Sequence, residues 1–373
     1  MSEEKLVPKL RFSGFDDEWK TYKLKDLLHN KSSSISINQL DDNVGNYPLY
    51  GASGFLKCID FYEMDSDYIS IVKDGSGVGN ISFHEKNTSV VNTSQYILPK
   101  ENLNIHFIFY LLQTINLNKY KTGSTIPHIY FKDYSIEKVK IPKYDEQKKI
   151  GILLKNLDAK IEILDNKLQM CQNFKKYLMQ QIFTQKLRFN FNDAWKTVKI
   201  KDIFDERSEK GFLDLELLSV TLNDGVIKRS EIESKDNSNE NKSNYKHVLP
   251  GDIVYNSMRM WQGASGVSPY EGIVSPAYTI LIPKNVYSKY FGYYFKTNEM
   301  VYQFKKYSQG LTSDTWNLKY PLISEIKIKI PSIEEQKEIT NVFEIMDEKI
   351  KILQNNIDEL TTFKKGLLQQ MFV

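Results

Sequence analysis

The sequence has few of the residues that build covalently cross-linked or metal-stabilised proteins. Its 373 residues include only two cysteines, Cys58 and Cys171, and five histidines, none of which forms a pair at metal-ligand spacing. Two isolated cysteines argue against a disulfide framework and a zinc site, and they are typical of a reducing compartment. We therefore expect a cytoplasmic protein without a metal site.

Long apolar runs are also missing. No stretch approaches the ~20 consecutive apolar residues that span a bilayer, and the N-terminal segment M-S-E-E-K has no apolar run of the kind found in secretory signals. The formal net charge is only +3, so the bulk charge does not mark a nucleic-acid or membrane binder. We expect no membrane partner.

Catalytic motifs are absent as well. The sequence has no G-x-x-x-x-G-K-[ST] loop, no Asn-Pro-Pro-aromatic motif of amino-methyltransferases and no nucleophile elbow. Asp74–Gly79 resembles a phosphate loop, but its glycines fall between two expected strands, which favours a tight turn. We therefore predict no catalytic residues and no cofactor in this chain.

What the chain does contain is one long helical segment that occurs twice. Residues 141–183 and 330–372 align without a gap, and 19 of 43 positions are identical. Apolar residues recur every seven positions in both copies, which is typical of a two-helix seam. The predicted seam residues are Ile150, Leu154, Leu157, Ile161, Leu164 and Leu168 in the first copy and Ile339, Phe343, Met346, Ile350, Leu353 and Ile357 in the second.

The charges of the two copies indicate how they pair. Residues 143–186 hold nine basic and five acidic side chains, whereas residues 331–373 hold five basic and eight acidic ones. Opposite net charge favours pairing the two copies within one chain. Lys175 and Lys364 interrupt the seam at equivalent places. Either they fix the register or partner of the helices, or their stems snorkel past neighbouring aromatic rings.

The duplication extends beyond the helices. Lys9–Phe12 reappears as Lys186–Phe189, and Trp19 is followed by the same two residues as Trp195. Runs of β-branched and aromatic residues with period two, separated by turn signals, predict a mixed α/β body in each half. Helical patches are expected at 105–114 and 289–302, an exposed loop at 231–244, and both tryptophans in cores. The predicted domains are a first body at 1–142, a first helix at 143–184, a second body at 185–330 and a second helix at 331–373.

Several loops of the bodies combine hydrogen-bonding and aromatic side chains. Asn, Arg and Gln can read base edges, and Tyr, Ser and Lys suit phosphates. For any single position a solvated loop residue is the alternative, and for Arg259 a structural role with bonds to nearby carbonyls or to Glu271 is another. The candidate DNA-binding residues are Tyr50, Ser53, Lys73, Ser76, Thr125, His128 and Tyr130 in the first body and Asn256, Ser257, Arg259, Trp261, Gln262, Thr312, Ser313 and Trp316 in the second.

The whole pattern resembles a known family. Two bodies alternate with two near-copies of I-P-x-x-x-E-Q-K-x-I, each followed by a heptad helix ending F-K-K-x-L-x-Q-Q-x-F. Together with the Y-G-A-S-G and K-D-G-S-G stretches, this is similar to the specificity (S) subunits of Type I restriction–modification enzymes, over essentially the entire chain. The resemblance implies two target recognition domains, each of which reads one half of a bipartite site in double-stranded DNA.

The resemblance also implies partners and a fold. The helices would act as a ruler and dock two methyltransferase (M) subunits, which bind S-adenosylmethionine, while motor–nuclease (R) subunits attached through them use ATP and Mg. The near-dyad of a bipartite DNA site then calls for antiparallel helices. The expected fold class is α+β, with a pseudo-two-fold axis and an antiparallel intramolecular coiled coil. The alternative, a tandem-domain scaffold or sugar-binding protein, explains the duplication but not the Arg, Asn and Gln loops.

Overall fold

The computed structural model describes residues 7–40, 43–222, 224–233, 238–239, 241–312 and 315–373. It divides into two compact units: unit 1 comprises Met1–Asn166 with Leu353–Val373, and unit 2 comprises Lys167–Ile352. The division falls within both long helices, so each unit holds one body and a part of each helix. The exposed loop expected at 231–244 lies partly outside the described residues.

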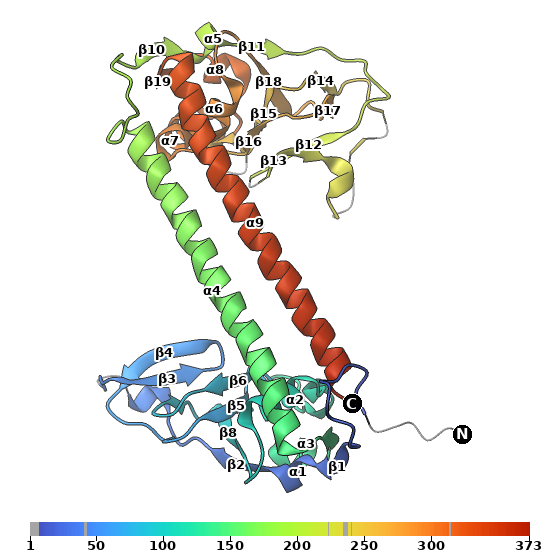
Figure 1. Ribbon diagram of the computed structural model, residues 1–373. Coiled ribbons are helices and arrows are strands. Elements are labelled where there is room, and N and C mark those ends of the chain that lie inside the picture. The colour runs from blue at the N-terminus through green and yellow to red at the C-terminus, as the bar shows by residue number, and fades with distance from the viewer. Residues whose placement is uncertain (1–6, 41–42, 223, 234–237, 240, 313–314) are drawn as a thin grey trace. The chain divides into compact units, whose positions relative to one another are not determined.

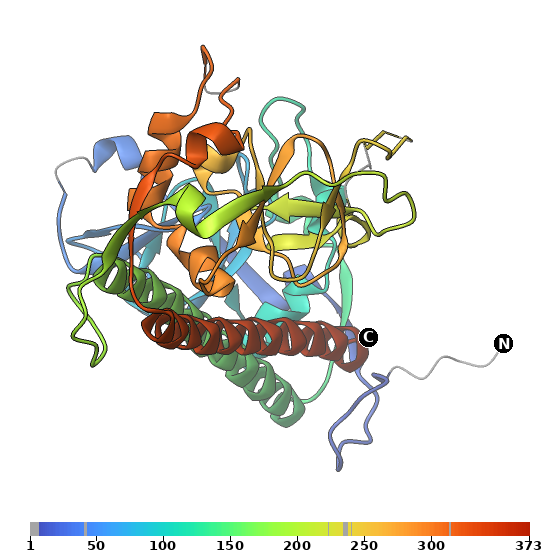
Figure 2. The same cartoon turned by 90° about the horizontal axis from the view of Figure 1, so that it is seen from above.

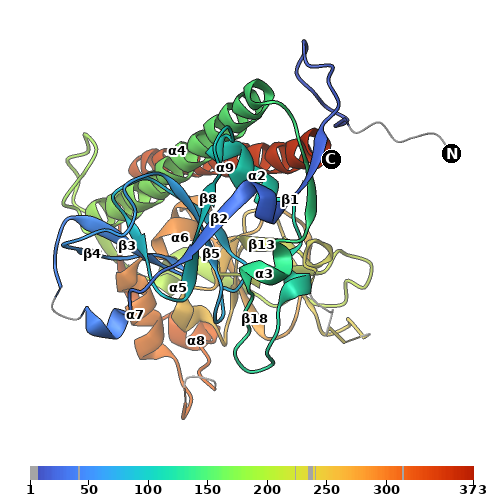
Figure 3. The same ribbon diagram turned by 90° about the horizontal axis from the view of Figure 1, so that it is seen from below.

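Unit 1 is built around a four-stranded sheet in the order β2-β8-β5-β6. Figure 3 labels strands β2, β8 and β5 of this sheet. All five residues of its strand β5 are buried, which accounts for the unbroken apolar character of that segment apart from Ser70. The strands are β1 (Lys20–Lys23), β2 (Leu28–Ser32), β3 (Tyr47–Gly51), β4 (Gly54–Ile59), β5 (Tyr68–Val72), β6 (Ile81–His84), β7 (Ser89–Val90), β8 (Ser94–Pro99) and β9 (Lys138–Ile141). The short helices are α1 (Leu24–Leu27), α2 (Ile105–Gln113) and α3 (Phe131–Tyr134), with 3-10 turns η1 (Ile37–Gln39) and η2 (Leu117–Tyr120).

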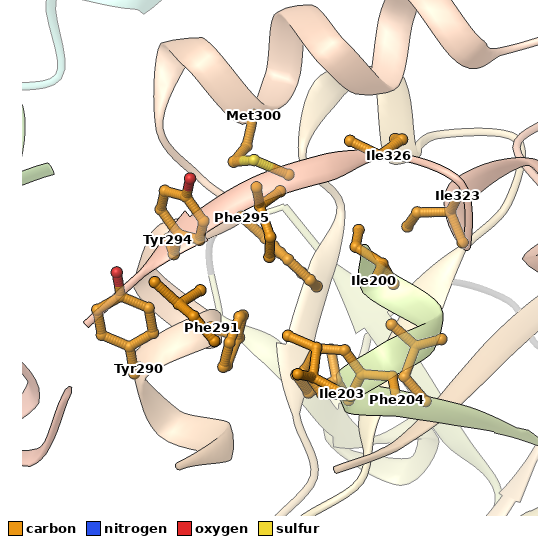
Figure 4. Close-up of a cluster of buried hydrophobic side chains, with 14 of the residues drawn as sticks. Ile200, Ile203, Phe204, Tyr290, Phe291, Tyr294, Phe295, Met300, Ile323 and Ile326 are labelled. Atoms are coloured by element: carbon orange, nitrogen blue, oxygen red, sulfur yellow. The ribbon is translucent and has the colours of Figure 1, made fainter. Parts of the chain in front are cut away.

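Unit 2 contains the corresponding sheet in the order β11-β18-β15-β16. Its aromatic core, which includes Phe204, Phe291 and Phe295, lies between this sheet and the short helices (Figure 4). The strands are β10 (Lys196–Lys199), β11 (Phe204–Arg207), β12 (Leu218–Thr221), β13 (Gly225–Lys228), β14 (Lys246–Val248), β15 (Ile253–Asn256), β16 (Ser265–Val267), β17 (Gly272–Val274), β18 (Tyr278–Pro283) and β19 (Lys327–Ile330). The short helices are α5 (Ile200–Ile203), α6 (Ser288–Tyr294), α7 (Asn298–Tyr307) and α8 (Tyr320–Ile323), with 3-10 turns η3 (Arg229–Glu231) and η4 (Met260–Gln262).

Two local expectations have different outcomes. The single helical patch expected at 289–302 is wrong, because Thr297 has extended backbone angles and caps a new helix, α7, by accepting a hydrogen bond from the Met300 N–H. The tight turn expected at Asp74–Gly79 is confirmed. It connects β5 to β6, and Gly75 and Gly79 both have a φ of +89°, a conformation that favours glycine.

The two long helices, α4 (Tyr144–Phe183) and α9 (Ile333–Met371), are antiparallel (Figure 1). In unit 1, Ile150 near the start of α4 shares a core with Met371 at the end of α9. In unit 2, Phe183 at the end of α4 shares a core with Ile339 near the start of α9. The C-terminus directly follows α9 (Figure 2). The predicted antiparallel pairing within one chain is confirmed.

The seam positions expected from the heptads are shielded from solvent. Six are buried and six are half-buried, whereas Ile152 and Ile163, which are apolar but lie off the seam, are 45% and 66% exposed. The buried ones are Ile150, Leu154, Leu168, Ile339, Phe343 and Leu353, and the half-buried ones are Leu157, Ile161, Leu164, Met346, Ile350 and Ile357. Among the helices of the described residues, none combines the length and apolar character needed to cross a bilayer.

The repeated Glu-Gln pair at the start of each long helix attaches that helix to its body. Glu146 accepts two hydrogen bonds from the Arg11 guanidinium, at 2.7 and 2.8 Å, and Glu335 accepts two from Arg188, at 3.1 and 2.7 Å. A bidentate pair of this kind fixes orientation as well as distance. The glutamine that follows each glutamate accepts a backbone N–H of the body and donates to the carbonyl of the Ile-Pro proline. This pair of contacts explains why the motif occurs in both halves.

Candidate nucleic-acid interface

In unit 1 the fold gathers the predicted loops beside the end of strand β5. The Lys73 carbonyl accepts a hydrogen bond from the Ile129 N–H at 2.9 Å, and Gly75 N–H donates to the Pro127 carbonyl at 3.0 Å. The Tyr50–Gly54 turn is adjacent, since a Cβ built at Gly77 would lie 3.0 Å from the Ala52 Cβ. The two hydrogen bonds join segments that are 56 and 52 residues apart in the sequence into one surface.

The side chains on this surface suit a nucleic acid. Ser76, Thr125 and Tyr130 are exposed, and Lys73 and His128 are half-buried. The His128 and Tyr130 rings meet edge to face at 5.1 Å, and the Lys132 ammonium lies 5.4 Å from the centre of the Tyr130 ring. Hydroxyl and ammonium groups can hold phosphates, and exposed rings can contact bases. Ser53 is also exposed, at the tip of the β3–β4 turn.

Unit 2 presents its candidates at the end of the equivalent strand, β15. The Ser257 carbonyl accepts a hydrogen bond from the Leu318 N–H at 2.9 Å, which joins the loop after β15 to the loop that contains Trp316. Trp261 and Trp316 pack edge to face at 5.4 Å, and the Lys305 ammonium lies 5.5 Å from the Trp316 ring. This loop after β15 and the loop after β5 therefore occupy the same place in the two sheets.

The individual candidates of unit 2 differ in accessibility. Arg259, Gln262 and Thr312 are exposed, and Asn256, Trp261 and Trp316 are half-buried. Ser257 lies in the interior, where its hydroxyl is 2.8 Å from the Thr279 hydroxyl, so it supports the loop from below. Ser313 is outside the described residues.

The guanidinium of Arg259 faces solvent. Within the described part of the chain it has no hydrogen-bond or ion-pair partner, although the backbone of Arg259 is held by Asn256 and Gln262. Glu271, the alternative partner considered from the sequence, is 2.9 Å from His247 Nε2 instead. A fixed backbone and a free guanidinium are what an arginine that reads a guanine requires.

Tyr50 lines a separate groove of unit 1 with a volume of about 890 Å³. His84 packs against its ring at 4.5 Å and against the Tyr68 ring at 5.0 Å, and its Nε2 is 2.9 Å from the Ser70 hydroxyl. Burial lowers the pKa of His84 to about 4, so the imidazole is neutral near pH 7. The groove wall therefore carries a stacked, uncharged aromatic cluster.

Each long helix also has an apolar outer face. Beyond Tyr144 at its first position, the exposed large apolar side chains of α4 fall within about 60° of arc at ~100° per residue, on the side opposite the seam. They are Ile152, Ile163, Met170, Phe174 and Tyr177, which are 45–71% exposed, and α9 has Ile345, Ile352 and Phe363 in the corresponding stripe. Apolar side chains that share one face of a helix form a larger patch than singly scattered surface residues do.

The sequence did not reveal the lysines that flank the loops, Lys132 and Lys305, because only the fold places them over aromatic rings of the candidate surfaces. Within the described residues, the structure contains no group of three or more His, Cys, Asp or Glu side chains placed to hold a metal ion.

The duplicated sheet, the paired loops and the antiparallel helices define a two-domain recognition protein, and comparison with known proteins supplies its family. The family described as "Type I restriction modification DNA specificity domain" matches residues 16–171 and 192–362. The chain therefore belongs to this family and carries its domain twice. The resemblance seen in the sequence is confirmed.

Relatives agree with this assignment. The chain is 23% identical over 398 residues to the Type I restriction enzyme MjaVIII specificity subunit of Methanocaldococcus jannaschii, covering 94% of this chain and 91% of that protein. Its fold is similar to the crystal structure of the Type I restriction–modification S subunit from M. genitalium, with a TM-score of 0.70, 16% identity, and coverage of 98% of this chain and 99% of that one. A chain from a structural study of complex assembly in the type I system gives a TM-score of 0.52 at 13% identity, covering 95% and 97%.

Proposed function

We infer that this chain is the DNA-recognition subunit of a Type I restriction–modification complex. Each body reads one half of a bipartite site in double-stranded DNA, and the helix pair sets the distance between the two readings. The chain is not an enzyme by itself. The observation that carries this proposal is the equivalent placement of the candidate loops at the ends of β5 and β15, in two domains of a DNA-specificity family.

The proposed reading set consists of the accessible candidates. Arg259, Asn256 and Gln262 are proposed to contact base edges, and Lys73 and His128 to contact phosphates, because side chains with two donor or acceptor atoms can read base edges and N–H donors can bind phosphate oxygens. The contacts that join each pair of loops hold the backbone in place, which supports readout by a preformed surface.

The apolar stripes on the outer faces of α4 and α9 are the proposed docking surfaces for two M subunits. Phe174 and Phe363 occupy equivalent positions in the two stripes, which suits one copy of the same partner on each helix. R subunits join through the M subunits. S-adenosylmethionine, ATP and Mg are proposed to bind these partners, and the whole complex to work in the reducing cytoplasm, a view supported by the two free cysteines.

The family match disfavours the alternative of a scaffold or sugar-binding protein.

Methylation-aware sequencing tests the proposal. The chain is expressed with its M subunits in a host that lacks adenine methylation, and the genome is read for modified adenines. We expect methylation at one bipartite motif with a fixed spacer, and none when the chain is omitted. The same methylation in the absence of this chain would contradict the proposal.

A further inference from the structure

The two lysines that interrupt the heptad seam each face a carboxylate of the opposite helix. Lys364 Nζ on α9 is 2.6 Å from Asp158 Oδ1 on α4. Lys175 on α4 makes the matching pair with Asp347 on α9. The two lysine side chains are only 18% and 20% exposed. The lysines therefore do more than extend their stems toward solvent, because both ammonium groups are paired.

A tyrosine of the body completes each pair. Tyr110 of α2 donates its hydroxyl proton to Asp158 Oδ2 at 2.7 Å, and Tyr293 of α6 donates to Asp347 Oδ2 at 2.8 Å. Both lysine ammonium groups lie 5.1 Å from the centre of the tyrosine ring in their own cluster. Burial, followed by the hydrogen bond to the aspartate, raises the pKa of both tyrosines, so each hydroxyl remains a donor. We call the clusters Lys364–Asp158–Tyr110 and Lys175–Asp347–Tyr293 the two trios.

Each trio lies within one compact unit and draws on three different elements. The aspartate comes from the helix that follows the body, the tyrosine from the body, and the lysine from the helix of the other half. A trio can form only when all three elements are in one relative position. Sliding one helix along the other by a single turn moves a lysine by about 5.4 Å, which breaks its ion pair.

The spacing of the trio residues allows both to form in the same register. Asp158 lies 17 positions before Lys175, and Asp347 lies 17 positions before Lys364. On antiparallel helices, equal spacing means that one alignment satisfies both ion pairs. A shift by one turn leaves the two ammonium groups without their carboxylate partners, although each aspartate keeps its tyrosine donor. An unpaired ammonium is unfavourable at positions where the lysine side chains are only 18% and 20% exposed. The core contacts of Phe183, Leu367 and Met371 favour the same register.

We propose that the two trios fix the register of α4 along α9 and thereby restrict the bipartite site to one spacer length. Lys175 and Lys364 are positioning residues and do not contact DNA. This inference rests on the function proposed above. One helical turn, about 5.4 Å, corresponds to between one and two base pairs at ~3.4 Å per base pair, so a loosened register admits spacers that differ by one or two base pairs.

The test replaces both lysines by methionine, which keeps the length of the stem and suits the seam. The matched control is Lys176→Met with Lys365→Met, because these lysines are the next residues in each copy and are exposed. Methylation-aware sequencing of cells that express each chain with its M subunits reads both half-sites and the spacer together. We expect the Lys175→Met, Lys364→Met chain to keep both half-sites and to methylate sites with neighbouring spacers at least about ten-fold more than the wild type. The control chain and the conservative Lys175→Arg, Lys364→Arg chain keep one spacer.

The possible outcomes distinguish a failure of the trios from a failure of folding and from a failure of the proposed function. An unchanged spacer in a folded double methionine chain overturns it, and so does complete loss of methylation when the chain still folds and binds M subunits. If the methionine chain does not fold, Tyr110→Phe with Tyr293→Phe removes only the hydroxyls, and relaxed spacing in that chain supports the trios while unchanged spacing overturns them. A wild-type chain that directs no bipartite methylation contradicts the proposed function, and the inference falls with it.

Discussion

Arg259 combines an exposed guanidinium with a backbone held in place on the loop after β15, and its role can be separated from that of a structural arginine. Arg259→Ala is expected to relax specificity at one position of one half-site, by about 1–3 kcal/mol of discrimination, because a bidentate contact to guanine is lost. The melting temperature should stay the same. Methylation-aware sequencing and thermal unfolding measure the two effects.

The matched control is Arg207→Ala in the same body. Arg207 is 11% exposed and pairs with Asp252 at 2.8 Å, so its loss should lower stability and leave base preference unchanged. Unchanged specificity in the Arg259 variant would remove this residue from the reading set. Uniformly weaker binding with a shallower salt dependence would make it a phosphate contact.

His84 is expected to make the stability of the folded protein decrease as the pH falls. Its pKa is about 4 in the folded protein and near its ordinary value of about 6.5 when unfolded, so protons bind preferentially to the unfolded chain. Its contribution to stability is complete above pH 6.5 and is lost as the pH falls toward 4, by about 3 kcal/mol in total. His84→Gln should flatten the fall in melting temperature between pH 6.5 and 5. His29→Gln, on an exposed position of β2, is the matched comparison variant.

The sequence identified individual residues of interest more readily than the side chains that they contact. Lys175 and Lys364 stood out because they broke a heptad, but two interpretations were left open. Their tyrosine partners, Tyr110 and Tyr293, lie on helices of the bodies, 48 and 54 positions before Asp158 and Asp347, and no local pattern links them. Contacts of this kind depend on how the body packs against the helix, which periodicity does not specify.

Among the elements, the ends of the long helices do more than terminate a coiled coil. Phe183, the last residue of α4, is 5% exposed and stacks on Phe343 at 5.9 Å and on Tyr294 at 5.3 Å. It therefore fills a place in the core of unit 2. The equivalent residue Phe372 stacks on Phe107 of unit 1 at 5.3 Å.

Phe183→Ala is expected to lower the free energy of unfolding of unit 2 by about 3–5 kcal/mol, since it leaves a cavity in an aromatic core. Phe174→Ala on the same helix is the control, because that ring is 54% exposed and its loss should change stability by no more than about 0.5 kcal/mol. Denaturant unfolding of the full chain measures both. Equal effects would show that the helix end is not part of the core.

The elements themselves were predictable to different degrees. The long helices followed from a seven-residue period, and α4 and α9 each begin one residue before the expected 145–183 and 334–372. The break between α6 and α7 was missed, because the local sequence around Thr297 continues to look helical and only the cap residue marks the new start. Pairings such as β5 with β8 join distant segments and could not be read from alternation alone.

For the whole molecule, duplication predicts that the two bodies are exchangeable. Replacing residues 20–140 with the body of a relative is expected to change one half of the methylated motif and to leave the other half intact, because each body has its own sheet and its own loops. Methylation-aware sequencing of the chimaera measures this directly.

The core of the donor body must be able to pack against the end of α9, because Leu367 and Met371 belong to the core of unit 1. A chimaera that folds and assembles but alters both halves of the motif would contradict the modular arrangement. The matching exchange of the second body should alter only the other half and serves as the control.

The composition of unit 1 has a consequence for synthesis in the cell. Its core includes Leu367 and Met371, which are made after all of Lys167–Ile352. At roughly 5–20 residues per second, these intervening residues take on the order of 10–40 s to translate. During that interval, the end of α9 has not yet been made. The first body therefore lacks the residues that pack against Trp19 and Phe107 in the finished chain. The first body is therefore synthesised first, but its core is completed last, when the C-terminal turns of α9 pack into it.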